Sequence, residues 1–414
     1  MLHFERLKLS NGLRILVNTD VSTPLVAMNI LYQVGAKNEE QDKTGFAHLF
    51  EHLMFGGSAN IPVYDEPLQL AGGENNAFTN NDFTNYYLTI PFQNVETAFW
   101  LESDRMLSLA FSEKSLEVQR QVVVEEFRQR YLNQPYGDAW LLLRPLAYKV
   151  HPYQWPTIGK EISHIEQASM DDVRGFFSKW YHTSNAILTL SGNITLEKAR
   201  ELSEKWFGPI EPKAAIKSNI PAEPAQTEKR ILEVERPVPH NALYKAWHCG
   251  KRTDSDFHTV DLLTDILSGG KSSRLYNRLV KERKIFSGLN LYLLGELDPS
   301  LVVADGKIYD GVSHTQAEQA LNEELFNLIA TGVGERELKK VVQKAESAFI
   351  FGEMNIGNRA LNMAYFEMLG NAAEMNLETS KYRSVTGDMI ISKAAEIFRE
   401  ENSSVIYYKA TSNQ

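Results

Sequence analysis

A proline-rich segment near the middle of the sequence limits most strongly how this chain can fold. Residues 208–228 read GPIEPKAAIKSNIPAEPAQTE and contain four prolines, with neither a helical nor a strand period. Such a segment is typical of an extended linker between domains. We therefore predict a first domain over residues 1–208, a linker over residues 209–228 and a second domain over residues 229–414.

Both predicted domains alternate strand-like and helix-like runs. In the first half, Val26–Leu31 and Tyr86–Ile90 are apolar runs of strand length, whereas Val95–Ala110 and Ser115–Tyr131 have a helical period. The second half shows the same mixture. This alternation predicts an α+β fold with two similar domains, each a largely antiparallel sheet covered by helices.

Composition and charge exclude some classes of protein. Hydrophobic residues make up 43% of the chain and charged residues 23%, which is typical of a globular protein. The net charge is −10, whereas a protein that binds nucleic acid usually presents a basic surface to the phosphates. We therefore expect no nucleic-acid partner.

The start of the chain resembles folded protein rather than a targeting segment. Alternating apolar residues on both sides of Asn11-Gly12 predict a β-hairpin, not a signal peptide. No run reaches the roughly 18 apolar residues needed to span a membrane. Cys249 is the only cysteine, which excludes a disulfide within the chain and favours a reducing compartment. We expect a cytoplasmic protein, or a periplasmic one if a signal peptide was removed.

The segment His48-Leu49-Phe50-Glu51-His52 carries the clearest chemical signal. Residues four apart share one face of a helix, so His48 and His52 can offer two imidazole nitrogens to one metal ion. Glu51 lies close to that face and can reach a water molecule without binding the ion. This is the H-x-x-E-H pattern of zinc peptidases, in which the glutamate is the general base.

The surrounding sequence supports a helix at this place. Thr44 is a suitable N-cap and Gly56-Gly57 a clear end signal. The segment between them is otherwise apolar, which predicts a buried helix. A glutamate on a buried apolar helix would be costly without a function. Two core histidines beside a surface glutamate are the alternative, and we weigh the metal site above it.

A third ligand is expected from the helical run that contains Glu125 and Glu126. Catalytic zinc sites usually take three protein ligands and leave one position open. At about 100° per residue, Glu125 points away from the apolar face of this run, whereas Glu126 lies at its margin. We therefore predict that Glu126 is the third ligand and that Glu125 is solvated.

The second half contains a faint echo of the metal segment. The runs HLFEHLMFGGS and DLLTDILSGGKSS both end a helical pattern in a glycine pair. Aligned on those glycines, the ligand positions correspond to acidic residues and the glutamate to a threonine. The aligned pairs are His48 with Asp261, Glu51 with Thr264, and His52 with Asp265. If the echo reflects a duplication, only the first copy has kept metal-ligand residues.

With these motifs assembled, the chain resembles the pitrilysin/insulinase family of zinc metallopeptidases, and is most similar to its short, mitochondrial-processing-peptidase-like bacterial members. The resemblance covers nearly the whole chain. The segments that carry it are Leu9–Val17, Thr44–Ser58, Gly72–Tyr87, His151–Gly159, Tyr181–Ile194 and Gly269–Glu282. The resemblance implies that the two domains form half of a clamshell around a chamber.

The resemblance also implies roles for single residues. By it, His48, His52 and Glu126 bind one Zn²⁺ per chain, and Glu51 is the catalytic base. Family members carry a second acidic residue seven positions before the ligand glutamate, and this chain has Gln119 there. Gln119 shares a helical face with Glu126 and can still form a hydrogen bond near the ligands.

Substrate binding follows from the same resemblance. The family binds an extended peptide as an added strand along a sheet edge near the metal. By the resemblance, that edge includes Asn76, Ala77 and Phe78. Without the resemblance, the glycines and asparagines around these residues would indicate a simple loop.

The second half departs from the pattern of active family members. These place an arginine, and a tyrosine seven residues later, after the GG-x-SSRL segment. The aligned positions here hold Val280 and Ser287, and Arg283 and Tyr276 are out of register. Some family enzymes divide the metal and the Arg/Tyr pair between two chains. We therefore expect a dimer, in which a related subunit supplies the pair, and leave open whether the dimer is homomeric or heteromeric.

These patterns predict a zinc-dependent endopeptidase that acts on extended peptides or unfolded segments. The alternative is a catalytically silent scaffold subunit of a family complex. Scaffold relatives tend to lose the metal motif, which is intact here. Substrate, cleavage preference and activity of the chain alone do not follow from the sequence.

Overall fold

The computed structural model describes residues 1–110, 112–214, 216 and 219–411. The chain forms two compact units that alternate along the sequence. Unit 1 consists of Met1–Arg128, Trp155–Ile220 and Ile350–Leu377; unit 2 consists of Gln129–Gln154, Pro221–Phe349 and Glu378–Gln414. Residues 215, 217 and 218 of the predicted linker lie outside the described residues. The linear division at residues 209–228 stays a prediction.

Unit 1 is built on a six-stranded sheet in the order β1-β2-β6-β3-β5-β4. Only β2 and β6 run parallel; the other neighbours are antiparallel. The strands are β1 (Glu5–Lys8), β2 (Arg14–Thr19), β3 (Leu25–Tyr32), β4 (Glu74–Thr79), β5 (Thr84–Pro91) and β6 (Ala186–Gly192). β1 and β2 form the hairpin predicted around Asn11-Gly12, which is confirmed.

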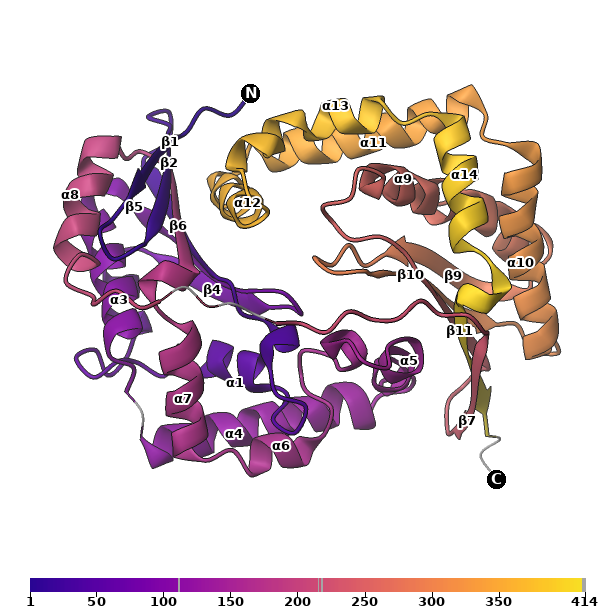
Figure 1. Cartoon of the computed structure of the whole chain (residues 1–414), viewed down its shortest axis with the longest axis horizontal. Helices are drawn as coiled ribbons and strands as arrows, with labels where there is room; N and C mark the ends of the chain where they lie inside the picture. The colour runs from indigo at the N-terminus through magenta and orange to yellow at the C-terminus, as the bar shows by residue number, and fades with distance from the viewer. Residues whose placement is uncertain (111, 215, 217–218, 412–414) are drawn as a thin grey trace. The chain divides into compact units, whose positions relative to one another are not determined.

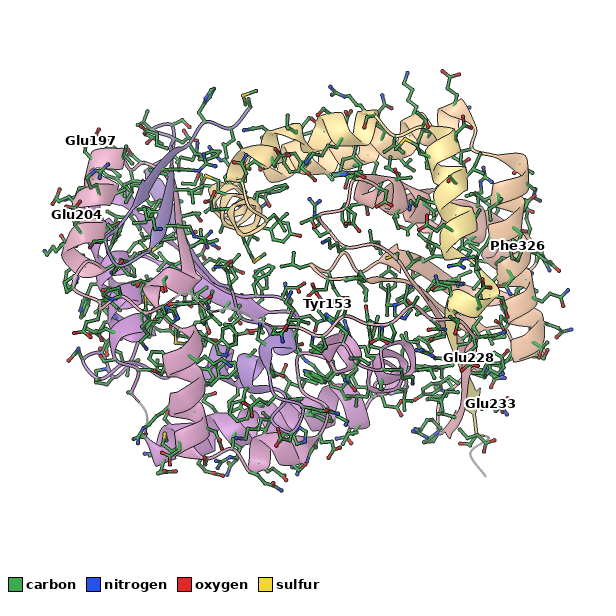
Figure 2. The ribbon with its side chains drawn as sticks, in the orientation of Figure 1. Tyr153, Glu197, Glu204, Glu228, Glu233 and Phe326 are labelled. Atoms are coloured by element: carbon green, nitrogen blue, oxygen red, sulfur yellow. The ribbon has the colours of Figure 1, made fainter. Side chains whose placement is uncertain are left out.

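Helices cover both faces of this sheet. α12 packs against β3 and β6, whereas α3 and α8 lie on the opposite face (Figure 1). The α-helices of unit 1 are α1 (Phe46–Leu53), α2 (Asp65–Leu70), α3 (Val95–Leu107), α4 (Glu113–Phe127), α6 (Ile162–Glu166), α7 (Met170–Trp180), α8 (Leu196–Trp206) and α12 (Ile356–Met368). Helix α8 packs on the sheet through one apolar face: Ala199 and Leu202 are buried, while Glu197 and Glu204 point to solvent (Figure 2).

Unit 2 repeats the strand order of unit 1. Its five-stranded sheet has the order β7-β11-β8-β10-β9, with β7 and β11 parallel and the other neighbours antiparallel. The strands are β7 (Arg230–Arg236), β8 (Ala242–His248), β9 (Phe286–Leu293), β10 (Leu301–Ile308) and β11 (Ser403–Ala410). This strand order, with its one parallel pair at the same end, matches the order β2-β6-β3-β5-β4 in unit 1. The predicted α+β fold, with two similar and largely antiparallel sheets, is therefore confirmed.

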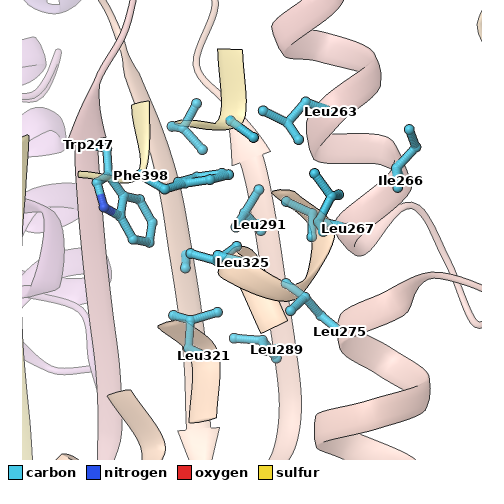
Figure 3. Close-up of a cluster of buried hydrophobic side chains, with 14 of the residues drawn as sticks. Trp247, Leu263, Ile266, Leu267, Leu275, Leu289, Leu291, Leu321, Leu325 and Phe398 are labelled. Carbon is cyan, nitrogen blue, oxygen red and sulfur yellow. The ribbon is translucent and has the colours of Figure 1, made fainter. Parts of the chain in front are cut away.

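The core of unit 2 lies between its sheet and its helices. Trp247 and Leu291 from the strands meet Leu263, Leu325 and Phe398 from α9, α10 and the end of α14 (Figure 3). The α-helices are α5 (Ala139–Ala147), α9 (Phe257–Ser268), α10 (His314–Thr331), α11 (Glu335–Gly352, mostly in this unit), α13 (Glu378–Arg383) and α14 (Gly387–Ile397). A π-helical segment, Tyr276–Glu282, precedes β9.

The halves of the sequence exchange one helix each. α5 comes from the first half but packs on β8 and β11 of unit 2. α12 comes from the second half but packs on β3 and β6 of unit 1, where the Thr189 hydroxyl donates to the Ala360 carbonyl at 2.7 Å. Each unit therefore needs segments from both halves of the chain.

Among the described residues, no helix is both long and apolar enough to cross a membrane.

Candidate metal centre

The helix α1 carries the H-x-x-E-H residues and begins at a glycine. Gly45 precedes it with φ +89°, and a Cβ there would lie 2.7 Å from the Ile158 carbonyl oxygen. Gly45 is thus the N-cap, and the predicted N-cap role of Thr44 is wrong. The Thr44 hydroxyl does not cap the helix; it accepts a hydrogen bond from the backbone N–H of Lys160 at 2.8 Å.

The apolar face of α1 fixes the rotation of the helix. Leu49 and Phe50 are fully buried. The Phe50 ring stacks on Phe176 of α7 and on Tyr181, with ring centroids 5.0 and 5.1 Å apart. Burial of this face turns the other side of α1, with both histidines, toward α4.

His48, His52 and Glu126 come together between α1 and α4. The two histidine Nε2 atoms are 3.3 Å apart. Glu126 Oε2 lies 3.7 Å from His48 Nε2 and 3.5 Å from His52 Nε2. Their side chains keep 13%, 17% and 23% exposure for His48, Glu126 and His52, so solvent can still reach the group.

These three donors fit a zinc ion. Nitrogen and oxygen ligands about 2.0–2.1 Å from a tetrahedral zinc lie about 3.3 Å from one another. The observed separations of 3.3, 3.5 and 3.7 Å are close to that value. Two imidazoles and one carboxylate are also the donor types of catalytic zinc sites, and three protein ligands leave a fourth position for water.

The two adjacent glutamates of α4 differ as helical geometry predicts. Glu126 turns toward the histidines, whereas the Glu125 side chain is 56% exposed and pairs with Arg128. The role of Glu126 as a metal ligand stays a prediction. Gln119, two turns before Glu126 on the same helix, is half-buried.

Glu51 lies on α1 next to the sheet edge. Burial raises the pKa of Glu51 above its ordinary value, and Thr79 of β4 and the nearby His52 oppose that shift. α1 contacts β4 directly. The Glu51 carboxylate therefore lies on the side of α1 that contacts the edge strand β4.

β4, with Asn76, Ala77 and Phe78, is the edge strand next to α1. The three residues pair with β5, opposite Tyr87, Tyr86 and Asn85. The Asn76 side chain is exposed, and its Oδ1 accepts the Ala77 N–H at 2.8 Å. Their predicted role in binding substrate stays a prediction.

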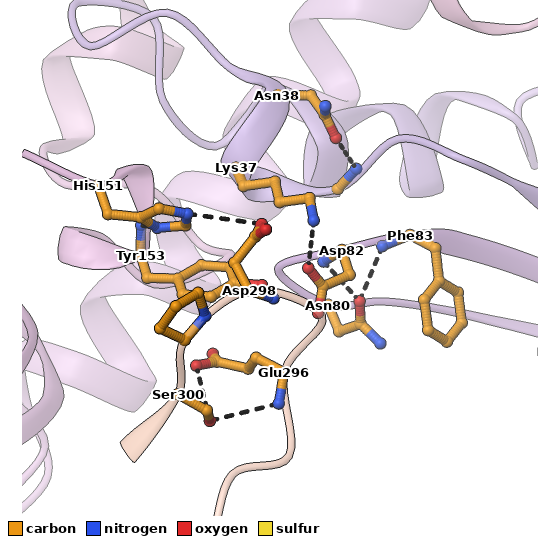
Figure 4. Close-up of polar contacts among 12 residues, drawn as sticks. Lys37, Asn38, Asn80, Asp82, Phe83, His151, Tyr153, Glu296, Asp298 and Ser300 are labelled. Carbon is orange, nitrogen blue, oxygen red and sulfur yellow. Dashed lines mark hydrogen bonds and ion pairs between the residues drawn. The ribbon is translucent and has the colours of Figure 1, made fainter. Parts of the chain in front are cut away.

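The turn after β4 is tightly held. Asn80 Oδ1 accepts the backbone N–H groups of Asp82 and Phe83 at 2.8 and 2.9 Å (Figure 4). Lys37, from the loop after β3, forms an ion pair with Asp82 at 2.8 Å. The edge strand therefore has a fixed end.

Glu39 is a residue of this site that the sequence reasoning missed. Its buried carboxyl accepts the Gly45 N–H at Oε2 and the Ala47 N–H at Oε1, both at 2.8 Å. Burial raises the pKa of Glu39 to about 8, although these backbone donors lower it. An acidic residue shortly before a helix lacking a side-chain cap was the available signal.

Val280 and Ser287, the two positions aligned with the Arg/Tyr pair of active family members, both lie in unit 2. Val280 packs against the core, and Ser287 is exposed on β9. Arg283 forms an ion pair with Glu323 at 3.0 Å. Neither an arginine nor a tyrosine thus stands at the two aligned positions.

Two family models match the chain. The model described as "Insulinase (Peptidase family M16)" matches residues 14–148, and the one described as "Peptidase M16 inactive domain" matches residues 167–345. The first range contains His48, His52 and Glu126, and the second contains none of them. The word inactive therefore describes the half without the candidate ligands.

Individual proteins and solved structures also resemble this chain over nearly its whole length. The zinc protease PqqE of Helicobacter pylori is 27% identical over 98% of this chain and 92% of that protein. The crystal structure of a protease from Helicobacter pylori matches with a TM-score of 0.94 and 25% identity, over 99% of this chain and 100% of that one. The periplasmic protease PqqL of Escherichia coli shares the fold, with a TM-score of 0.79 and 17% identity, over 99% of this chain but 48% of that one.

Proposed function

This chain belongs to the pitrilysin/insulinase family of zinc metallopeptidases, and we propose that it is a zinc-dependent endopeptidase that cleaves extended peptides or unfolded segments. The observation that carries the proposal is the convergence of His48 Nε2, His52 Nε2 and Glu126 Oε2 at zinc-ligand spacing. Relatives over nearly the whole chain are zinc proteases by name, which supports the same class of activity.

The chemistry divides between the ion and Glu51. A zinc ion held by His48, His52 and Glu126 would lower the pKa of a water molecule and polarise the scissile carbonyl. Glu51 then accepts the proton of the attacking water on a carboxylate oxygen. It donates that proton to the departing amine nitrogen as the peptide bond breaks.

The edge strand β4 explains a preference for extended substrates. A peptide that pairs with Asn76, Ala77 and Phe78 would be held through its backbone, so its sequence matters less than its extended conformation. β4 contacts α1, so such a peptide would pass Glu51. A compact folded protein offers no free backbone for this pairing.

We propose that the active form is a dimer. Val280 and Ser287 cannot replace the arginine and tyrosine that active relatives use to hold substrate, so a related subunit would supply them. The chain covers about half of PqqL, which supports the idea of one half that works with another. A cytoplasmic location, or a periplasmic one after removal of a signal peptide, stays a prediction.

Hydrolysis of a quenched-fluorescent peptide mixture by the zinc-loaded chain tests the proposal. Glu51→Gln should keep zinc and lose about 10²- to 10⁴-fold in rate, the usual range for a general base. Glu125→Gln is the matched control, since it changes an exposed glutamate, and should retain the wild-type rate. Equal rates for the wild type and Glu51→Gln would contradict the assigned base.

The partner requirement is tested in the same assay. If the zinc-loaded chain is inactive alone, a related chain carrying the arginine and tyrosine should restore cleavage. Activity of the chain alone would show that it needs no second kind of subunit. Inactivity with zinc bound and with such a partner present would favour the scaffold alternative.

A further inference from the structure

We propose that Glu39 is a positioning residue that sets the zinc affinity of the site by fixing the start of α1. This inference rests on the proposed function. Glu39 lies nine residues before His48, and its carboxyl accepts backbone N–H groups at the first turn of the helix. It acts on His48 and His52 only through α1, the helix that carries them.

The first turn of α1 has no cap of its own. The first N–H groups of any helix lack partners within the helix, and a side chain at the N-cap usually accepts one of them. Here the N-cap is Gly45, which has no side chain and makes no side-chain cap hydrogen bond. Any Cβ at this position would meet the Ile158 carbonyl, so glycine is required. Glu39 therefore takes over the capping role from outside the helix.

The segment that carries Glu39 is itself held against the edge strand. Residues Ala36–Asn38 form a short 3₁₀ turn directly before Glu39. The Ala36 N–H donates to the Asn80 carbonyl at 3.1 Å, and the Lys37 N–H to the Asn81 carbonyl at 2.9 Å. Both acceptors belong to the turn after β4. The segment thus bonds to the end of the edge strand on one side and to α1 on the other.

Two further contacts make this connection stiff. A Cβ on Gly35 would lie 2.5 Å from the Asn81 backbone, so the segment and the turn are in close contact. The Trp155 indole N–H donates to the Ala36 carbonyl at 3.0 Å. A shift of Glu39 would therefore move α1 relative to β4, and with it His48 and His52 relative to Glu126.

Small shifts matter because the ligand atoms lie at contact distances. The three separations of 3.3, 3.5 and 3.7 Å fit one ion only while α1 and α4 keep their present relation. Groups that orient metal ligands typically change metal affinity by 10- to 100-fold when mutated. Glu39 acts one step further away, through the backbone, so the lower end of that range applies.

The test compares Glu39→Gln with Glu40→Gln in the full chain. A carboxamide keeps one acceptor oxygen but sets an NH₂ group against a backbone N–H, whereas Glu40 is exposed and serves as the matched control. The zinc dissociation constant is measured by competition with a chromophoric chelator. It should rise about tenfold in Glu39→Gln and stay unchanged in Glu40→Gln. The visible spectrum of the Co²⁺-substituted chain should change in Glu39→Gln alone.

The outcomes separate this inference from the proposed function. A Glu39→Gln chain that unfolds at a lower temperature but has the wild-type zinc affinity and Co²⁺ spectrum would overturn the inference, because Glu39 would then be merely structural. A wild-type chain that binds neither zinc nor Co²⁺ would overturn the proposed function as well. If Glu39→Gln does not fold, Glu39→Asp, which keeps the carboxyl but is shorter, should show the same direction of change.

Discussion

Helix α1 of unit 1 follows β3, and helix α9 of unit 2 follows β8, the corresponding strand of a sheet with the same strand order. The polar residues of the two helices nevertheless make different contacts. The two imidazoles of α1 and the Glu126 carboxylate of α4 turn toward one point. On α9, the aligned Asp265 pairs with Lys344 of α11 at 2.8 Å, and Asp261 accepts the Tyr382 hydroxyl at 2.6 Å.

The two units thus partner their polar residues differently at corresponding places of the same strand order. α4 is the second α-helix after β5, and α11 is the second α-helix after β10, the strand that corresponds to β5. Glu126 and Lys344 therefore come from corresponding helices. Unit 2 supplies its own cation, the Lys344 ammonium. In unit 1, under the proposed function, a zinc ion would take the corresponding place beside α1. The comparison therefore explains why only the first half would bind metal.

Removal of a ligand should produce the largest difference between the two helices. His52→Ala takes away one of three donors and should abolish stoichiometric zinc binding and peptide hydrolysis. Asp265→Ala, at the aligned position of α9, should leave one zinc per chain and the wild-type rate. Metal analysis after dialysis, together with the peptide assay, measures both. Loss of zinc in Asp265→Ala would break the comparison.

Core truncation should separate stability from metal binding. Phe50→Ala on α1 removes a ring stacked on Phe176 and should lower the free energy of unfolding by about 3–5 kcal/mol. Leu263→Ala on α9 should cost about 2–5 kcal/mol. Only Phe50→Ala should also weaken zinc binding, since it loosens the helix that holds the ligands. Urea unfolding and chelator competition measure the two effects, and equal zinc affinities would contradict this account.

The acidic residue Asp261 should give unit 2 a pH dependence of its own. Burial raises the pKa of Asp261 above its ordinary value of 3.8, and the Tyr382 hydroxyl opposes the shift. The folded chain then binds more protons than the unfolded chain just above pH 3.8, so the free energy of unfolding falls as pH rises through that window. Asp261→Asn should flatten this part of the profile. An unchanged slope in thermal melts over the acidic range just above pH 3.8 would contradict this prediction.

The Lys344 ammonium should contribute little to stability. Its side chain is more than half exposed, and exposed ion pairs contribute about 0–1 kcal/mol. Lys344→Met should therefore change the unfolding free energy by no more than about 1 kcal/mol. Urea unfolding at low and high salt measures this change. A much larger loss of unfolding free energy would contradict the prediction, because the ion pair between Lys344 and Asp265 would then be essential to the stability of unit 2.

The sequence predicted the parts of the site that depend on local periodicity. The spacing of His48 and His52 placed both on one side of a helix, and the helical angle distinguished Glu126 from Glu125. The structure brings these three side chains together. The hairpin at the start of the chain likewise follows from a short alternating pattern around Asn11-Gly12.

The parts that depend on distant contacts could not be predicted in this way. Thr44 looked like an N-cap because its type is right, but the approach of Ile158 makes Gly45 the cap and leaves Glu39 to accept the N–H groups. The exchange of α5 and α12 between the halves is equally invisible, because each helix carries a buried face whatever sheet it covers. Local sequence shows that a helix is amphipathic, not which sheet lies beneath it.

The most direct test of the account is the position of zinc in crystals of the zinc-loaded chain. Anomalous scattering at the zinc edge should give one peak per chain, about 2.0–2.2 Å from His48 Nε2, His52 Nε2 and a Glu126 oxygen, with none beside Asp261 or Asp265. A peak beside α9, or no peak between α1 and α4, would contradict the central claim that the first half alone holds the catalytic metal.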